Sequence, residues 1–337
     1  MEYRNLGRTG VKVSQLCLGT MMFGRRTTET DAIPMIEHAL DAGINFIDTA
    51  DAYSAGESER IVGAALASGG RRARTIVATK AFFPRDADDP NAFGLSRRHL
   101  IDACEASLKR LGTDWIDLYQ LHRPQADVPI DETLRALDDL IRAGKVRYVG
   151  TSMFAAWKIV ESLWAAKELG LNRFVCEQPT YHLLDRTAER EVLPAAQTFG
   201  LGVIPWGPLC GGLLSGKYRR GDFSAAGRWQ GGKDNFDRAV TPAAVDALEA
   251  LVELADEKGC PLSQLALAWN AAQPGVTAPI IGPRTMEQLV DNLACVSLRL
   301  DAAELARIDA VVPPMSSAMR YYDAARGTDP RPNLGRW

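Results

Sequence analysis

The chain has 337 residues, of which 46% are hydrophobic and 24% are charged, values typical of a globular protein rather than a disordered one. Its 39 Lys and Arg residues and 42 Asp and Glu residues give a net charge of −3, so the composition gives no reason to expect a nucleic acid or a membrane as a partner.

Several features that the sequence lacks indicate a cytoplasmic protein. The first residues, MEYRNLGRTGVKVSQ, contain no apolar stretch of a secretory signal, and no apolar run approaches the roughly 18 residues of a membrane span. The six cysteines are scattered without CxxC spacing, which is typical of free thiols in a reducing compartment. Four histidines and no HExxH motif argue against a metal site. We therefore expect a soluble cytoplasmic protein without a metal.

Short apolar segments predict the strands. Residues Tyr3–Leu6 and Val11–Gln15 flank the turn Gly7–Gly10 and predict a β-hairpin. Eight later segments are nearly continuous apolar runs, as expected of parallel strands that are buried on both faces. These segments are Cys17–Gly19, Asn45–Asp48, Thr75–Thr79, Trp115–Leu121, Val146–Gly150, Arg173–Glu177, Gly202–Trp206 and Val276–Ile281.

Longer amphipathic segments alternate with these strands. Leu134, Leu137 and Ile141, for example, recur at helical spacing, and Thr241 followed by Pro242 is typical of a helix start. Eight strand–helix units of about 40 residues each have the proportions of a (β/α)8 TIM barrel. The alternative, a doubly wound α/β sheet, usually carries GxGxxG after its first strand, and this chain has no such motif. We therefore predict a barrel whose N-terminal mouth is plugged by the hairpin.

We expect a single domain that spans residues 1–337. Two irregular stretches, Leu209–Val240 and Pro313–Trp337, exceed ordinary loop lengths, which is typical of segments that bind or gate. We predict that the C-terminal tail, residues 313–337, borders the substrate pocket, although its Pro and Gly content leaves disorder as the alternative.

Titratable side chains follow three successive strands of the predicted barrel. Asp48, Lys80 and His122 come at the ends of the second, third and fourth strands, and Tyr53 follows Asp48 by five residues. Each alone has an ordinary explanation, such as a turn-capping carboxylate or a solvated lysine. Barrel enzymes, however, place their working residues at the C-terminal ends of the strands, so we expect these four to converge.

The four side chains make chemical sense as a proton-donating unit. A phenol has a pKa near 10, but a nearby ammonium group lowers that pKa, and a carboxylate holds the ammonium in place. We therefore expect Lys80 to lower the pKa of Tyr53, Asp48 to orient Lys80, and His122 to hydrogen-bond a substrate oxygen.

Long motifs across residues 3 to 300 give the chain a specific resemblance to the aldo-keto reductases. They include YRNLGRTGVKVSQLCLGTMMFG, FIDTADAY, ATK ending at Lys80, DLYQLH ending at His122, GTS at 150–152, EQP at 177–179, PWGPLCGGLLSGKYR and IIGPRTMEQLVDN. The resemblance implies that Asp48, Tyr53, Lys80 and His122 are the catalytic tetrad. Tyr53 would then donate a proton as hydride passes from NADPH to a carbonyl carbon.

The resemblance also implies a set of NADPH-binding residues. At the nicotinamide end, Ser152 and Gln178 match the groups that hold the carboxamide, and Trp206 stands where the family has a stacked aromatic ring. Met153 departs from the family, in which many members have asparagine, so one carboxamide hydrogen bond is in doubt. The full set is Gly19, Thr20, Asp48, Ser152, Gln178, Trp206, Leu209, Gly211, Lys217, Gly282, Arg284, Gln288 and Asn292.

Gly19, Thr20 and Asp48 also belong to the nicotinamide end, and Gly282, Arg284, Gln288 and Asn292 match the adenosine end. Leu209, Gly211 and Lys217 match the segment that wraps the pyrophosphate, and Arg284 is placed to meet a 2′-phosphate through its bidentate donors. Residues Gly211–Lys217 read GGLLSGK, which resembles a Walker A motif. Tyr218 replaces its final Ser or Thr, so a nucleotide triphosphatase is not expected.

The substrate is less clear from the sequence. Aromatic residues near the expected pocket loops are consistent with an apolar pocket or with loop packing: Phe82, Phe83, Phe93, Trp115, Trp229, Tyr321, Tyr322 and Trp337. Four arginines are candidates for an anion but more often belong to a solvated surface: Arg220, Arg228, Arg320 and Arg331.

Three functions follow from these residues. The first is an NADPH-dependent reductase of a small-molecule aldehyde or ketone. The second is a cofactor-binding regulatory subunit, because channel-associated relatives share the fold. The third is a barrel aldolase with Lys80 as its Schiff-base amine. An aldolase would leave the match of GPRTMEQLVDN, residues 282–292, to a cofactor's adenosine end unexplained. The sequence specifies neither the carbonyl substrate nor the oligomeric state.

Overall fold

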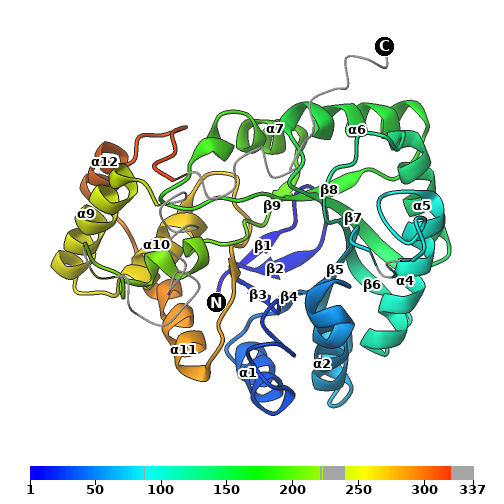
Figure 1. Cartoon of the computed structure of the whole chain (residues 1–337), viewed down its shortest axis with the longest axis horizontal. Coiled ribbons are helices and arrows are strands. Elements are labelled where there is room, and N and C mark those ends of the chain that lie inside the picture. Colours follow the sequence, from blue (N-terminus) through cyan, green and yellow to red (C-terminus); the bar gives the residue numbers. More distant parts are fainter. Residues whose placement is uncertain (85, 87, 221, 223–239, 320–337) are drawn as a thin grey trace.

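One parallel sheet of eight strands forms the centre of the part of the chain that the computed structural model describes, residues 1–84, 86, 88–220, 222 and 240–319 (Figure 1). Its strand order is β10-β3-β4-β5-β6-β7-β8-β9, so neighbours in the sequence are neighbours in space. The strands are β3 (Cys17–Gly19), β4 (Phe46–Asp48), β5 (Ile76–Ala81), β6 (Ile116–Leu121), β7 (Val146–Ser152), β8 (Phe174–Gln178), β9 (Gly202–Val203) and β10 (Ile280–Ile281).

Parallel bridges between the two end strands close the sheet into a barrel. Val203 pairs with Val276 and Trp206 with Ile280, and the backbone N–H of Ile280 donates to the carbonyl of Pro205 at 2.8 Å. The predicted (β/α)8 TIM barrel is therefore confirmed.

The last two strands are shorter than predicted because prolines interrupt them. The predicted strand Gly202–Trp206 ends at Val203, and the predicted strand Val276–Ile281 begins at Ile280. Pro205 and Pro279 lie in the lost parts, and proline has no N–H to donate to a strand ladder.

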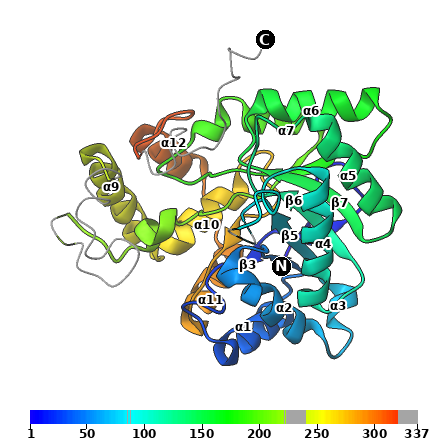
Figure 2. The same ribbon diagram turned by 45° about the vertical axis from the view of Figure 1, so that its right-hand side comes forward.

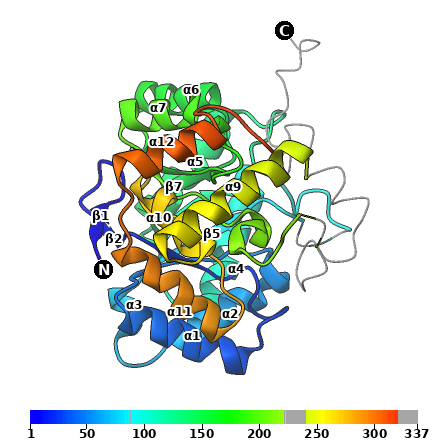
Figure 3. The same ribbon diagram turned by 90° about the vertical axis from the view of Figure 1, so that its left-hand side faces the viewer.

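Helices surround the barrel, and each strand is followed by at least one of them (Figure 1). Figure 2 shows α4 to α7 on one side of the sheet and α9, α10 and α12 on the other, and Figure 3 shows α9, α10 and α11 side by side. The predicted helix start at Thr241 is confirmed, since its side chain accepts from the N–H of Ala244 and Pro242 opens the helix. The helices are α1 (Glu29–Asp41), α2 (Glu57–Leu66), α3 (Arg71–Arg74), α4 (Arg97–Leu111), α5 (Ile130–Arg142), α6 (Ala156–Glu168), α7 (Val192–Phe199), α9 (Pro242–Lys258), α10 (Leu262–Ala272), α11 (Met286–Ala294) and α12 (Ala302–Val311).

The N-terminal hairpin closes the bottom of the barrel. Strands β1 (Tyr3–Asn5) and β2 (Lys12–Ser14) pair antiparallel, and they lie in the middle of the ring of helices in Figure 1. Leu6 belongs to the buried cluster of barrel-lining side chains. The turn residue Gly7 has φ +57°, and a Cβ there would lie 2.6 Å from the backbone nitrogen of Gly202, so only glycine fits. The predicted plug is therefore confirmed.

Alternation along the strands separates an apolar lower layer of the barrel interior from a polar upper layer. Side chains two residues apart point to the same face of a strand. Interior apolar side chains are therefore followed two residues later by polar ones that point into the barrel near the C-terminal strand ends. The lower side chains are Phe46, Ala78, Leu118 and Cys176, and the upper ones are Asp48, Lys80, Gln120 and Gln178. All four upper side chains are buried.

The start of the C-terminal tail is docked onto the loop between β8 and α7. The N–H of Arg186 donates to the carbonyl of Ser316 at 2.8 Å, and the N–H of Ala318 donates to that of Leu184 at 2.9 Å. The rest of the predicted tail, from residue 320, lies outside the described residues, as do residues 223–239 of the other long stretch. Among the helices that the structure describes, none is long and apolar enough to span a membrane.

Candidate active site

A buried ion pair lies at the centre of the polar layer. Lys80 Nζ donates to Asp48 Oδ2 at 2.6 Å and to the carbonyl of Thr49 at 2.9 Å, and the Lys80 side chain is fully buried. Its third donated bond goes to the Tyr53 hydroxyl at 3.1 Å. A lysine that is fully buried needs such partners, because an unpaired charge in the interior is costly.

Two amide side chains hold the other oxygen of the Asp48 carboxylate. Oδ1 accepts from Gln178 Nε2 at 2.9 Å and from Gln120 Nε2 at 3.1 Å. Gln120 is a site residue that the sequence reasoning missed, although its place two residues before His122 gives it the same strand face. Gln178 was expected to bind a cofactor carboxamide, and here its Nε2 supports Asp48.

A left-handed turn brings Tyr53 to the ion pair. Tyr53 begins the 3-10 turn Tyr53–Gly56, in which Ser54 and Ala55 have φ values of 51° and 54°. This conformation is rare for residues with a side chain, and Ser54 stabilises it by donating to the carbonyl of Phe23 at 2.9 Å. The turn returns the phenol over the barrel mouth, where its oxygen meets Lys80 Nζ.

His122 completes the expected group of four. Its ring packs edge-on against Tyr53, with 5.8 Å between ring centroids, and against Phe83 at 4.9 Å. The buried Nδ1 atom of His122 has no hydrogen-bond partner in the described part of the chain. The predicted convergence of Asp48, Tyr53, Lys80 and His122 is thus seen in the structure.

The electrostatics correct one expectation. Burial raises the pKa of Tyr53 above its usual value, and although Lys80 lowers it in part, the net direction is upward. The expectation that Lys80 brings the phenol below its usual pKa is therefore wrong for this structure, because desolvation of the phenolate outweighs the ammonium.

Lys80 and His122 differ in protonation: the lysine is charged and the imidazole is neutral. Burial opposes the charge of Lys80, but Asp48 and Tyr53 outweigh it and raise the pKa of the ammonium. Burial lowers the pKa of His122 well below 6.5, and Lys80 and Arg123 lower it further. At neutral pH the site therefore contains a charged lysine, a protonated phenol and a neutral imidazole.

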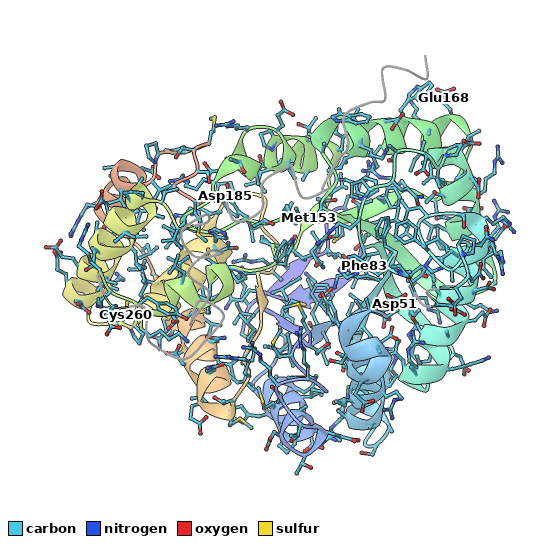
Figure 4. All side chains as sticks on the ribbon, viewed as in Figure 1. Asp51, Phe83, Met153, Glu168, Asp185 and Cys260 are labelled. Carbon is cyan, nitrogen blue, oxygen red and sulfur yellow. The ribbon has the colours of Figure 1, made fainter. Side chains whose placement is uncertain are left out.

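Met153 has a strained backbone beside this group. Its φ is +63°, a region where asparagine is favoured over most residues. Its sulfur accepts from the indole Nε1 of Trp206 at 3.1 Å and lies 3.5 Å from the Thr180 hydroxyl. In Figure 4, Met153, Phe83 and Asp51 are labelled toward the middle of the ring of helices, whereas Glu168 and Cys260 are at its edge.

The residues expected near a nicotinamide lie around the same barrel mouth, but not all have free polar groups. The Ser152 hydroxyl donates to the carbonyl of Gln178 at 3.0 Å. Thr20 is fully buried, and its hydroxyl donates to the carbonyl of Asp48 at 3.1 Å, so this hydroxyl helps to position the Asp48 backbone. Gly19 packs so closely that a Cβ would lie 2.5 Å from the Ile280 side chain.

The two cations predicted to meet the cofactor phosphates, Lys217 and Arg284, come from distant parts of the chain. Lys217 follows the turn Cys210–Ser215, and Arg284 directly precedes the cap of α11. Burial lowers the pKa of Lys217, and the charge of Arg284 lowers it further. The Arg284 guanidinium has no hydrogen bond or ion pair in the described part of the chain. A lysine that feels the charge of a second cation in this way suits an anionic ligand.

The residues predicted to meet the adenosine end lie on or just before α11. Gln288 and Asn292 lie one turn apart on α11, and Gln288 Oε1 accepts from the backbone N–H of Arg284 at 2.9 Å. A Cβ on Gly282 would meet nothing within 4 Å, so the surface there is open. Leu209 caps the glycine-rich turn in which Gly211 has φ +64°.

The candidate substrate residues divide into three groups. Phe82 packs edge-on against both Phe83 and Phe93, which forms an aromatic cluster beside His122. Trp115 was expected near the pocket but lies at the opposite end of the barrel, because it precedes β6, and Arg220 forms a surface ion pair with Asp246. The other residues lie outside the described part of the chain: Trp229, Tyr321, Tyr322, Trp337, Arg228, Arg320 and Arg331.

Comparisons with known proteins agree with this geometry. The profile of the Aldo/keto reductase family matches residues 15–313. A Bacillus subtilis (strain 168) protein named "Uncharacterized oxidoreductase YrpG" is 45% identical, covering 93% of this chain and 96% of its own length. A probable voltage-gated potassium channel subunit beta of Oryza sativa subsp. japonica is 38% identical (93% and 97%). Versiconal hemiacetal acetate reductase of Aspergillus parasiticus is 34% identical (92% and 96%).

Proposed function

Since the chain belongs to the aldo/keto reductase family, we propose that it uses NADPH to reduce an aldehyde or a ketone to an alcohol, with Tyr53 as the proton donor. The observation that carries this proposal is the position of Lys80 Nζ between two partners, 2.6 Å from Asp48 Oδ2 and 3.1 Å from the Tyr53 hydroxyl. An ammonium in contact with a phenol stabilises the phenolate that forms when the phenol gives up its proton.

The raised pKa of Tyr53 suits a general acid rather than opposing it. A donor must carry its proton at working pH, and the burial of Tyr53 ensures that it does. As the proton leaves for a substrate oxygen, negative charge develops on the phenol oxygen beside Lys80. Asp48 keeps Lys80 charged and in place, and Gln120 and Gln178 keep Asp48 in place.

His122 has a different role in the proposal. Because its pKa lies well below 6.5, its ring is neutral and is a poor source of protons at neutral pH. A neutral imidazole still has one N–H donor. We assign His122 the orientation of the substrate carbonyl oxygen through that donor, next to the Tyr53 hydroxyl.

The residues around the barrel mouth fit a nicotinamide dinucleotide phosphate. The cations Lys217 and Arg284, whose charges influence each other, suit its phosphates. The Trp206 ring, which donates its N–H to the Met153 sulfur, provides a flat surface for the nicotinamide. When bound, NADPH would supply the hydride for the carbonyl carbon. In this proposal Gly19, Thr20, Asp48, Ser152, Gln178, Leu209, Gly211, Gly282, Gln288 and Asn292 complete the contact surface.

A regulatory subunit is the second candidate, favoured by the 38% identity to a probable potassium channel beta subunit. An aldolase is disfavoured, because a Schiff base needs a neutral amine and Lys80 is a buried ammonium paired with Asp48. That residues 1–337 form one domain, that the tail borders the pocket and that the protein works in the cytoplasm stay predictions.

An NADPH-oxidation screen over sugars, aldehydes, ketones and α-dicarbonyls tests the enzyme proposal. We expect turnover with at least one class, at a rate that falls when Tyr53 is replaced by Phe. NADPH binding without turnover on any member of the panel would contradict the reductase and support the regulatory subunit.

A further inference from the structure

A cavity lies at the N-terminal mouth of the barrel, away from the candidate active site. Its volume is about 300 Å³, and its lining residues are Leu6, Val11, Ile76, Asp117, Arg147 and Tyr148. The first two come from the ends of the plug hairpin, and the others from the beginnings of β5, β6 and β7. Asp48, Lys80 and His122 lie at or just beyond the opposite ends of their strands, so this cavity is separate from them.

The acidic residue of the lining, Asp117, is already paired with an arginine that is not part of the lining. Arg72 pairs with Asp117 at 2.8 Å and donates to the carbonyl of Trp115 at 2.7 Å. The same carboxylate accepts from the backbone N–H of Val77 at 3.0 Å and from the Trp115 indole at 3.2 Å. Asp117 is therefore neutralised and fully hydrogen-bonded, and it presents little net negative charge to the cavity.

The arginine of the lining, Arg147, has no such partner. Arg147 lies on the other strand of the β6–β7 pair, with its guanidinium 5.8 Å from the centroid of the Trp115 ring. In the described part of the chain, its guanidinium makes no hydrogen bond and no ion pair. Asp117 is paired with Arg72 alone, so Arg147 leaves one positive charge at the rim of the cavity.

The rest of the lining completes a site with one polar end and one apolar end. Tyr148 follows Arg147 in β7, so its side chain points to the other face of the strand and packs with the apolar cluster. Leu6 is buried, and Val11 and Ile76 are partly buried against the same apolar cluster. Ligand sites commonly combine an apolar lining with a few convergent polar groups in this way.

We propose that this cavity is a binding site for a small organic carboxylate with a short apolar or aromatic body. The planar guanidinium of Arg147 matches a carboxylate through two parallel N–H donors, and the Tyr148 ring adds to the apolar lining. The body of the ligand packs on Leu6, Val11 and Ile76. The volume, at the low end for ligand pockets, admits a ligand the size of benzoate but not a dinucleotide.

Benzoate is the probe, and the indole N–H signals of the full-length protein labelled with 15N-tryptophan report its binding by NMR. Trp115 reports on the proposed site and Trp206 on the candidate active site, so binding at the two places is distinguished in one titration. Their signals are assigned with Trp115→Phe and Trp206→Phe.

We expect the Trp115 signal to shift and saturate with benzoate, whether or not the Trp206 signal also moves. Arg147→Ala should weaken the binding seen at Trp115 by about tenfold or more, the typical effect of losing a charge-assisted pair. The matched control is Arg135→Ala, an exposed arginine on α5, and it should bind as the original chain does. A Trp115 signal that does not respond, or one that saturates equally in Arg147→Ala, would overturn the proposal.

Discussion

Replacing Arg284 by Ala separates the two nicotinamide cofactors. Its guanidinium makes no hydrogen bond or ion pair in the described part of the chain, and only its backbone is engaged, by Gln288 and Thr27. Arg284→Ala therefore removes no internal bond, and the fold should survive. What it removes is a charge-assisted partner for a 2′-phosphate, which NADPH has and NADH lacks.

The size of the effect follows from that partner. Hydrogen bonds to charged groups contribute roughly 1.5–3 kcal/mol, and each 1.4 kcal/mol is a factor of about ten in affinity. We expect the Kd for NADPH to rise by about ten- to a hundredfold, whereas the Kd for NADH stays within about twofold. Loss of Arg284 also relieves the repulsion of Lys217, which keeps the effect toward the lower end.

Fluorescence titration of both cofactors measures this effect, with Arg135→Ala as the control for removing a distant surface arginine. An equal loss for NADPH and NADH, or no loss for either, would refute the assignment of Arg284 to the 2′-phosphate.

Three further perturbations test other parts of the site and the fold. Lys80→Met should lower kcat by roughly 10²–10⁴-fold, because the phenolate of Tyr53 loses the ammonium beside it. It should also lower the melting temperature, since it leaves the Asp48 carboxylate buried with amide partners only. An unchanged single-turnover rate would contradict the first expectation. Met153→Asn should tighten NADPH and NADH alike by several-fold in titrations, because asparagine tolerates φ +63°, offers an amide to the carboxamide and has an oxygen that can replace the sulfur as acceptor for the Trp206 N–H; weaker binding of both cofactors would contradict it. Burial lowers the pKa of His182 to about 4, although the charge of Asp185 raises it in part. As the pH falls from 6.5 to 4, this residue therefore binds a proton in the unfolded chain but not in the folded chain. The stability lost over that window, about 3 kcal/mol from this residue, should be absent from the urea unfolding of His182→Asn, and an identical pH dependence would contradict the argument.

The fold was predictable because its strands are buried on both faces. The continuous apolar runs before Asp48 and His122 indicate buried parallel strands, and the absence of a GxGxxG motif distinguishes the barrel from a doubly wound sheet. The exact ends were not predictable, since Pro205 and Pro279 interrupt pairing that the apolar pattern alone suggests.

The convergence of the site was predictable for the same reason, but its energetics were not. Strand ends placed Asp48, Lys80 and His122 on one rim, whereas the net direction of the Tyr53 pKa depends on how deeply the phenol is buried. The sequence likewise does not reveal that the Gln120 amide donates to the Asp48 carboxylate, because an amide in an apolar strand gives no signal of its partner. The left-handed backbone of Met153 is also set by tertiary contacts.

The central claim is that Tyr53 donates the proton, and single-turnover NADPH oxidation by Tyr53→Phe tests it most directly. The substitution removes one hydroxyl and little volume, and the Lys80–Asp48 pair keeps its 2.6 Å contact, so NADPH binding should be preserved. General acid catalysis is worth roughly 10²–10⁴-fold, and the rate of the chemical step should fall by that amount. In Tyr53→Phe combined with Lys80→Met, the loss should be far smaller than the product of the two single losses, because both residues serve one proton transfer. A near-normal single-turnover rate in Tyr53→Phe would contradict the account.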